Sequence, residues 1–127
     1  MSAGQPVALI AFEVTIDCAD AVVLAEFWKH AVGYVAHGDP GPGTAWLSDP
    51  RGVAPHLCLI EVPEPKIVKN RMHIDLAVSG EGPPEEKWRR VVGEAARLQA
   101  AGGRVLAEFA GRWITMADPE GNEFDVC

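Results

Sequence analysis

Two stretches of the chain place titratable side chains on one face of a predicted strand. In residues 71–79 (RMHIDLAVS), His73 and Asp75 lie two positions apart between apolar residues. In residues 12–20 (FEVTIDCAD), Glu13 occupies the equivalent place. Because successive side chains of a strand point to opposite faces, each stretch presents its titratable groups on a single side. Imidazole and carboxylate groups transfer protons and bind divalent metal ions, so the two stretches predict a chemical site if their strands lie together.

The elements that must position these groups occur twice along the chain. The first half predicts a strand from about 7 to 17, a helix from Asp20 to about Gly33, and strands at 34–37, 44–48 and 56–62. The second half predicts a strand at 71–78, a helix at 84–101, and strands at 104–109, 112–116 and 122–127. Asp-Pro-x-Gly turns recur at 49–52 and 118–121. Strand, helix and three strands, repeated, indicate an internal duplication.

We therefore expect an α+β fold in which two βαβββ modules form a curved mixed sheet around a cleft. The modules span about 7–62 and 71–127, joined by a linker at 63–70, and together make one domain. Each helix has one apolar stripe and is expected to cover the convex side of its sheet, which leaves the concave side as the cleft.

The period of two assigns the strand residues to these two sides. The cleft side is expected to hold Glu13, Thr15, Asp17, Trp46, His56, Cys58, Ile60, His73, Asp75, Trp113, Thr115, Glu123 and Asp125. The core side is expected to hold Phe12, Val14, Ile16, Leu47, Leu57, Leu59, Met72, Ile74, Leu76, Val78, Ile114, Met116, Phe124 and Val126. So many polar groups on matching strand faces are unusual for a sheet that is buried on both sides. His30 and His37 are expected to face water.

Composition limits the classes of function. The chain has 127 residues and a net charge of −7, which argues against nucleic acid or an anionic membrane as partner. It contains no apolar run of about 18 residues, as a membrane span requires, and no signal pattern at its start. Three widely spaced cysteines without a Cys-x-x-Cys pair indicate reduced thiols and a cytoplasmic protein.

Several of these motifs together resemble the vicinal oxygen chelate superfamily, and more closely its bacterial glyoxalase-like domain proteins. The resemblance covers essentially the whole chain. Its most specific parts are the run VPEPKIVKNRMHIDL at 62–76 and MADPEGNEF at 116–124, supported by VTIDCAD at 14–20, LAEFW at 24–28, Gly33-Tyr34 and DPRG at 49–52.

The resemblance implies paired βαβββ modules around a cleft, as derived above, and two kinds of function. Members such as glyoxalase I, extradiol dioxygenases and fosfomycin resistance enzymes hold a divalent metal that chelates neighbouring substrate oxygens. Bleomycin-binding members sequester a drug without metal ligands. Because the fold hosts both, the function must be argued from individual residues.

Position by position, the resemblance implies a metal set of Glu13, His73 and Asp125. The family has His where Glu13 stands and usually Glu where Asp125 stands, so this sequence departs from the pattern at two of three places. The first-module position equivalent to Asp125 is left open between His56, Cys58 and Ile60, and with His56 there it would supply a fourth ligand. Such a set suits Zn²⁺, Mn²⁺, Fe²⁺ or Ni²⁺.

Two functions from different classes follow. As a lyase or isomerase, the protein would use Glu13 as base and His73 as acid or metal ligand, moving a proton next to a carbonyl. The residues expected to contact the substrate are Trp46, His56, Ile60, Asp75, Trp113 and Thr115. As a binding protein, it would sequester an aromatic or cationic compound. A remnant domain with an empty cleft is a third interpretation.

The site residues also have purely structural interpretations. Glu13 and His73 could form only an ion pair, Asp75 could only brace His73, and Trp46 and Trp113 could be ordinary packing. The sequence does not decide whether the modules pair within one chain or between the chains of a homodimer.

Overall fold

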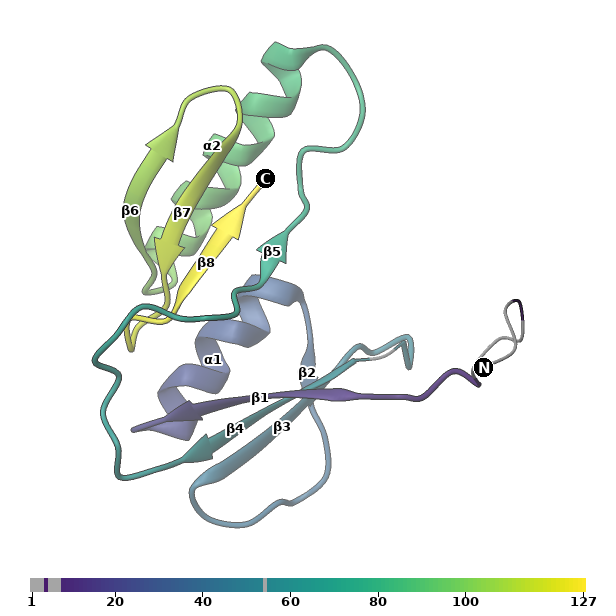
Figure 1. Ribbon diagram of the computed structural model, residues 1–127, viewed down its shortest axis with the longest axis vertical. Helices are drawn as coiled ribbons and strands as arrows, with labels where there is room; N and C mark the ends of the chain where they lie inside the picture. The colour runs from purple at the N-terminus through teal and green to yellow at the C-terminus, as the bar shows by residue number, and fades with distance from the viewer. Residues whose placement is uncertain (1–3, 5–7, 54) are drawn as a thin grey trace.

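A computed structural model describes residue 4, residues 8–53 and residues 55–127. The elements are β1 (Glu13–Cys18), α1 (Ala21–Val32), β2 (Val35–Ala36), β3 (Thr44–Ser48), β4 (His56–Glu61), β5 (Asp75–Leu76), α2 (Pro84–Ala100), β6 (Arg104–Phe109), β7 (Trp113–Ala117) and β8 (Glu123–Val126). They form two four-stranded sheets, in the orders β1-β4-β3-β2 and β5-β8-β7-β6 (Figure 1). The α+β fold of two βαβββ modules, expected from the duplication, is confirmed.

Both modules have the same strand topology. β1 pairs in parallel with β4, which pairs antiparallel with β3, and β5 and β8 repeat this with β7. The helix between the first and second strands of each module provides the crossover that a parallel pair needs. In each sheet the first strand, β1 or β5, therefore lies at an edge with one side unpaired.

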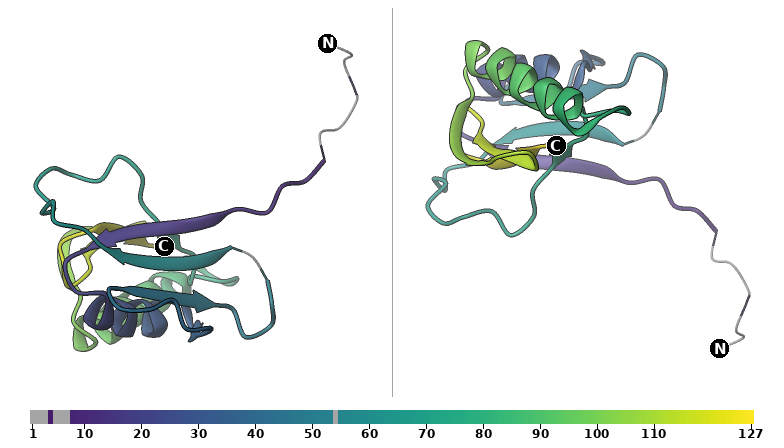
Figure 2. Two further views of the ribbon diagram at one scale, coloured as in Figure 1. Left: turned by 90° about the horizontal axis from the view of Figure 1, so that it is seen from below. Right: turned by 90° about the horizontal axis from the view of Figure 1, so that it is seen from above.

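Both helices lie on one side of the molecule and the strands on the other (Figure 2). The buried residues of the two modules form one hydrophobic cluster. Its centre is aromatic: the rings of Phe27 and Trp28 on α1 lie 5.7 and 5.3 Å from the ring of Phe124 on β8. The central strand residues assigned to the core side are buried as predicted; they are Leu47, Leu57, Leu59, Ile114, Met116, Phe124 and Val126.

The ends of α1 follow the sequence signals. The Asp20 side chain accepts hydrogen bonds from the backbone N–H groups of Val22 and Val23, as an N-cap does. Gly33 ends the helix in the left-handed conformation, at φ 75°. The charged helix α2 starts at Pro84 without a side-chain cap, and Glu85 and Glu86 in its first turn complement the helix dipole.

The first strand of each module is shorter than predicted. β1 begins at Glu13, because its partner β4 begins opposite it at His56, so residues 8–12 have no strand to pair with. Phe12, expected in the core, is 66% exposed. β5 has two residues, since its neighbour β8 has only four, and Met72 in front of it is 86% exposed. Residue 7, where the strand was predicted to begin, lies outside the described residues.

Candidate functional site

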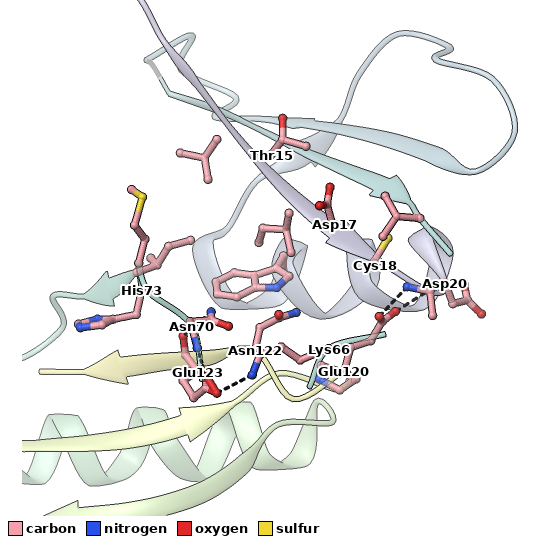
Figure 3. A pocket seen from close by; sticks show the side chains of 18 of the residues that line it. Thr15, Asp17, Cys18, Asp20, Lys66, Asn70, His73, Glu120, Asn122 and Glu123 are labelled. Carbon is pink, nitrogen blue, oxygen red and sulfur yellow. Dashed lines mark hydrogen bonds and ion pairs between the residues drawn. The ribbon is translucent and has the colours of Figure 1, made fainter. Parts of the chain in front are cut away.

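A groove lies between the modules and has a volume of about 1150 Å³. β1 and the turn after it form one wall, and the linker with residues 72–74 forms the opposite wall. The turn before β8 closes one end, and Trp28 and Val23 of α1 contribute from below. Figure 3 shows Asp20 and Glu120 at one end of this groove and His73 at the other.

The groove has apolar walls and an acidic lining. Its apolar side chains include Val14, Ile16, Ile74 and Trp28. Its carboxylates are Glu13, Asp17, Asp20, Glu64, Glu120 and Glu123, whereas Lys66 is its one lysine or arginine among the described residues. A hollow of this size and character suits a small molecule, and its charge favours one that carries a cation or binds through a metal ion.

Two of the carboxylates hold the walls of the groove in place. Glu120 accepts hydrogen bonds from the backbone N–H groups of Ala19 and Asp20, at 2.6 and 2.9 Å, and so ties the second module to the start of α1. Glu123 accepts one from the Asn70 backbone N–H at 2.9 Å and pairs with the Lys66 ammonium at 2.8 Å. Burial acts to raise the pKa of Glu123, but these hydrogen bonds outweigh it and the pKa is lowered.

His73 belongs to a compact cluster at its end of the groove. Its Nδ1 lies 2.9 Å from Asp75 Oδ1 and 3.5 Å from Asp125 Oδ2. β5 and β8 place Asp75 directly opposite Asp125, and the Thr115 hydroxyl donates a hydrogen bond to Asp125 Oδ1 at 2.6 Å. Asp75 is therefore within hydrogen-bond distance of His73, as the expected bracing requires.

The donor set of this cluster fits a divalent metal. One potential ligand atom each from His73, Asp75 and Asp125 lies within 4.8 Å of the other two. Among the described residues this is the only such group of three or more. One imidazole and two carboxylates match the preferences of Mn²⁺, Fe²⁺, Ni²⁺ or Zn²⁺, and the Thr115 hydroxyl orients one of the carboxylates as outer partners of metal ligands do.

Glu13 lines the groove but does not join this group. Its carboxylate lies 3.8 Å from His56 Nδ1 and 3.7 Å from Cys58 Sγ, on its own sheet. The ion pair between Glu13 and His73 considered from the sequence is therefore absent from the described residues, because each group has partners within its own module.

The other sequence candidates lie on the sheet faces that no helix covers. In the first sheet, Glu13 pairs with His56 and Trp46 pairs with Cys58. Ile60 lies on β4 two residues after Cys58, on the same face. Trp113 and Thr115 lie on β7 of the second sheet, where Thr115 pairs with Asp125. The candidates that do not line the groove are Trp46, His56, Ile60, Asp75, Trp113, Thr115 and Asp125.

A family model for the glyoxalase-like domain matches residues 13–127, which is most of the chain. The chain belongs to the glyoxalase-like domain family. The resemblance to the vicinal oxygen chelate superfamily drawn from the motifs is confirmed. No functionally curated protein matches the sequence.

Solved structures show the same fold as this glyoxalase-like protein. A possible glyoxalase from Bacillus cereus has a TM-score of 0.65 at 22% identity, over 94% of this chain and 98% of that one. A glyoxalase/bleomycin resistance protein/dioxygenase family enzyme from Burkholderia phytofirmans PsJN has a TM-score of 0.65 at 18% identity, over 90% and 94%. A fosfomycin resistance protein, FosX, from Listeria monocytogenes, complexed with Mn(II) and a dihydroxypropylphosphonic acid, has a TM-score of 0.63 at 16% identity, over 99% and 90%.

The strand registers of the glyoxalase-like protein show which of His56, Cys58 and Ile60 is the first-module counterpart of Asp125. If Glu13 and His73 are equivalent, then Thr15 is equivalent to Asp75. Thr15 pairs with Cys58, and Asp75 pairs with Asp125, so the first-module counterpart of Asp125 is Cys58. Counting from the two Asp-Pro-x-Gly turns had pointed to His56 instead. That count was wrong because the segment between turn and strand position is two residues longer in the first module than in the second.

Burial and the Glu13 carboxylate raise the pKa of the Cys58 thiol. Cys58 therefore stays protonated at neutral pH, which makes it a poor metal ligand compared with Asp125. The duplication left the two modules with different chemistry at equivalent places.

Three residues of the glyoxalase-like protein have roles that the sequence analysis missed. Trp28 belongs to the apolar stripe of α1 yet also lines the groove. Glu120 was assigned to a turn and to the family motif at 116–124, but to no contact of its own. His37, expected in water, packs against Trp46 and His56, and its Nδ1 is buried without a hydrogen-bond partner among the described residues. Only for His37 did the sequence indicate the contact, since its predicted strand at 34–37 is followed directly by the predicted strand that contains Trp46.

No helix in the described part of the chain is long and apolar enough to cross a membrane.

Proposed function

We propose that this glyoxalase-like protein binds a small oxygenated molecule in the groove between its modules and acts on it as a lyase or isomerase with the help of a divalent metal. The observation that supports this most is the cluster of His73, Asp75 and Asp125, whose His73 lines a groove with apolar walls. The Mn(II) in the FosX complex, which shares the fold, agrees with a metal in such a protein.

His73 and Asp125 would hold the metal, with Asp75 as a third ligand or as the brace of His73. A bound divalent ion polarises a carbonyl oxygen and so makes a neighbouring C–H group more acidic. Glu13, on the opposite wall of the same groove, is the base that takes this proton. The apolar walls exclude water from the reacting carbon.

Metal binding tests the proposal directly. Protein purified without chelator is titrated with Mn²⁺ and Zn²⁺ by calorimetry, and its metal content is measured by mass spectrometry. We expect one ion per chain, and at least tenfold weaker binding in His73→Ala and Asp125→Asn, since each removes one of three ligands. His30→Ala, at an exposed position of α1, is the control. Unchanged metal affinity in both site variants would contradict the proposal.

The acidic lining of the groove favours a second function, sequestration of a cationic aromatic compound without catalysis. Asp17 and Glu64 line the groove and make no ion pair with any described residue. We expect an aromatic amine to bind more tightly than its uncharged analogue in metal-free protein, and Asp17→Asn with Glu64→Gln to remove that preference. Equal binding of both compounds would rule out this function.

Assembly into a homodimer belongs to the same proposal. β1 has an open edge beside the groove, and Leu9, Ile10 and Phe12 continue from it as exposed apolar residues. Exposed apolar edges of this kind are usually covered by another chain. A second copy seated there would close the open side of the groove.

The mass of the protein in solution, measured by light scattering during size-exclusion chromatography, tests whether it is a dimer. We expect the mass of two chains, shifting toward one chain in a variant with Ile10→Ser and Phe12→Ser. Val92→Ser, at an exposed position of α2, should not change the mass. A single chain at all concentrations would contradict the dimer.

A cytoplasmic location remains a prediction from the sequence.

A further inference from the structure

The hairpin between β6 and β7 carries an exposed group of aromatic and cationic side chains. Phe109 and Trp113 face each other across the two strands, with ring centroids 4.6 Å apart and ring planes 30° apart. The guanidinium carbon of Arg112 lies 4.9 Å from the centroid of the Trp113 ring. We call Phe109, Arg112 and Trp113 the aromatic ledge.

A tight turn holds the ledge together. The Arg112 backbone N–H donates a hydrogen bond to the Phe109 carbonyl at 2.8 Å. Between them Gly111 has φ 77°, a conformation that other residues rarely adopt. The cross-strand pairing of Phe109 with Trp113 then fixes how their rings stack. The ledge is thus built by the backbone of the hairpin and needs no ligand to form.

The ledge lies on the same sheet face as the His73 cluster. Trp113 and Thr115 are two residues apart on β7, so their side chains share a face at a spacing of about 7 Å. Thr115 is hydrogen-bonded to Asp125 of the cluster. Along β8, Glu123 of the groove precedes Asp125, and Cys127 lies beyond it on the side of Trp113. The cluster therefore stands between the groove and the ledge.

Packing within the chain leaves part of the ledge uncovered, although Trp113 itself is half-buried. Phe109 is 42% exposed and Arg112 is exposed. The Arg112 guanidinium makes no ion pair with any described carboxylate, although acidic residues outnumber basic ones by 18 to 11 in the chain. An exposed aromatic ring and a guanidinium that has no carboxylate partner are groups that proteins use to recognise flat ligands and carboxylates.

We propose that the aromatic ledge binds a planar aromatic carboxylate. The flat ring of the ligand covers the exposed part of the Phe109–Trp113 stack, and its carboxylate accepts two parallel hydrogen bonds from the Arg112 guanidinium. An aromatic cation is disfavoured because the guanidinium would repel it. This site is separate from the groove and does not depend on a metal.

Three related probes test the chemistry of the ledge in the presence of a chelator. They are naphthalene-2-carboxylate, its uncharged amide, and the saturated decalin carboxylate. Titration is followed by NMR at the indole N–H signals of the four tryptophans, assigned from single Trp→Phe variants. We expect naphthalene-2-carboxylate to shift the Trp113 signal saturably, with the amide and the decalin acid each binding at least roughly tenfold more weakly.

Matched variants separate the ledge from general charge effects. Arg112→Gln should weaken binding of naphthalene-2-carboxylate to the level of the amide. Arg89→Gln, at an exposed position of α2, removes the same charge and should leave binding unchanged. Phe109→Ala should weaken both aromatic probes alike. A two-dimensional amide spectrum of each variant confirms that it is folded.

The proposal is wrong if the amide binds as tightly as the acid, if Arg89→Gln weakens binding as much as Arg112→Gln, or if the shifted signal is not that of Trp113. Because all titrations are metal-free, these outcomes do not depend on whether the His73 cluster holds a metal. Failure of the metal titrations would in turn leave the ledge unaffected.

Discussion

Trp28 shows how one side chain serves both the core and the site. Its indole N–H donates a hydrogen bond to Asp118 Oδ2 at 3.0 Å, across the boundary between the modules. Asp118 is one of the few buried charged residues, and it also accepts hydrogen bonds from the backbone N–H groups of Glu120 and Asn122. A buried carboxylate is stable only when such donors surround it, so the indole helps to keep the turn before β8 in place.

Replacing Trp28 by Phe should therefore destabilise the protein through one hydrogen bond as well as through volume. A hydrogen bond to a buried charged group contributes about 1.5 to 3 kcal/mol, and we expect a loss of that order in the free energy of unfolding. Urea denaturation measures it. Trp88→Phe, at a half-buried position of α2, should cost clearly less. An equal loss in both variants would show that the bond to Asp118 contributes little.

The pair of Glu13 and Cys58 can be tested through thiol chemistry. Burial and the Glu13 carboxylate both raise the pKa of Cys58. Glu13→Gln removes the carboxylate charge, so the pKa of Cys58 should fall and its alkylation by iodoacetamide at pH 8 should become faster. Peptide mass mapping distinguishes Cys58 from Cys18, whose pKa is raised to about 11 chiefly by burial. An unchanged rate at Cys58 would mean that burial alone protects the thiol.

At the scale of the element, the loop between β2 and β3 depends on one glycine. Gly38 has φ 65°, and a Cβ atom there would lie 2.7 Å from Cε3 of Trp46. The neighbouring His37 backbone N–H donates to the Trp46 carbonyl at 3.0 Å, so the backbone is held against the indole and cannot easily move away. Residues 38–43 lie between the strands predicted at 34–37 and 44–48, but the sequence gives no indication of this contact.

Gly38→Ala should consequently cost more than backbone strain alone. A non-glycine residue in the left-handed region costs about 1 to 2 kcal/mol, and overlap of the new Cβ with the indole of Trp46 adds to this cost, by up to about 1 to 3 kcal/mol if the ring is held in place. Gly33→Ala, at φ 75° with no atom within 4 Å of the added Cβ, reports the strain term by itself. Urea denaturation of both variants gives the difference. Equal losses would mean that Trp46 shifts to make room.

On the scale of the whole molecule, polar contacts of two glutamates hold the linker and the modules together. Glu120 bonds the backbone at the start of α1, and Glu123 bonds Asn70 and Lys66 of the linker. The lowered pKa of Glu123 makes the second contact dependent on pH. Its folded pKa lies below the unfolded value of about 4.3, so its contribution is fully present above that value and is lost as the pH falls through the folded pKa.

Glu123→Gln should thus destabilise the protein at pH 7 and have a progressively smaller effect below about pH 4. Urea denaturation at several pH values measures this. Asp49 also has a lowered pKa, because of hydrogen bonds from Arg51, so its protonation in acid lowers the stability too. Asp49→Asn removes this contribution, so that the effect of Glu123 can be measured separately. A difference between Glu123→Gln and the unmodified protein that stays constant with pH would contradict the assignment.

Local patterns predicted much of this protein. The alternation in the strands placed Leu57, Leu59 and Phe124 in the core, and Asp20 and Gly33 marked the ends of α1, because these signals act within a few residues of chain. The same alternation failed for Phe12 and Met72. Whether an apolar strand residue is buried depends on a neighbouring strand long enough to cover it, and that length is set elsewhere in the chain.

The order of residues along the chain determined the duplication and most of the strand faces, since both depend on spacing, while its motifs carried the resemblance to the family. Which groups meet was decided only in three dimensions. His73 meets Asp75 and Asp125, while Glu13 meets His56 and Cys58, because hydrogen bonding pairs each first strand with the last strand of its own module. The groove likewise depends on tertiary contacts: the rings of Phe27 and Trp28 on α1 pack against Phe124 of β8, and the groove is lined by β1, an edge strand.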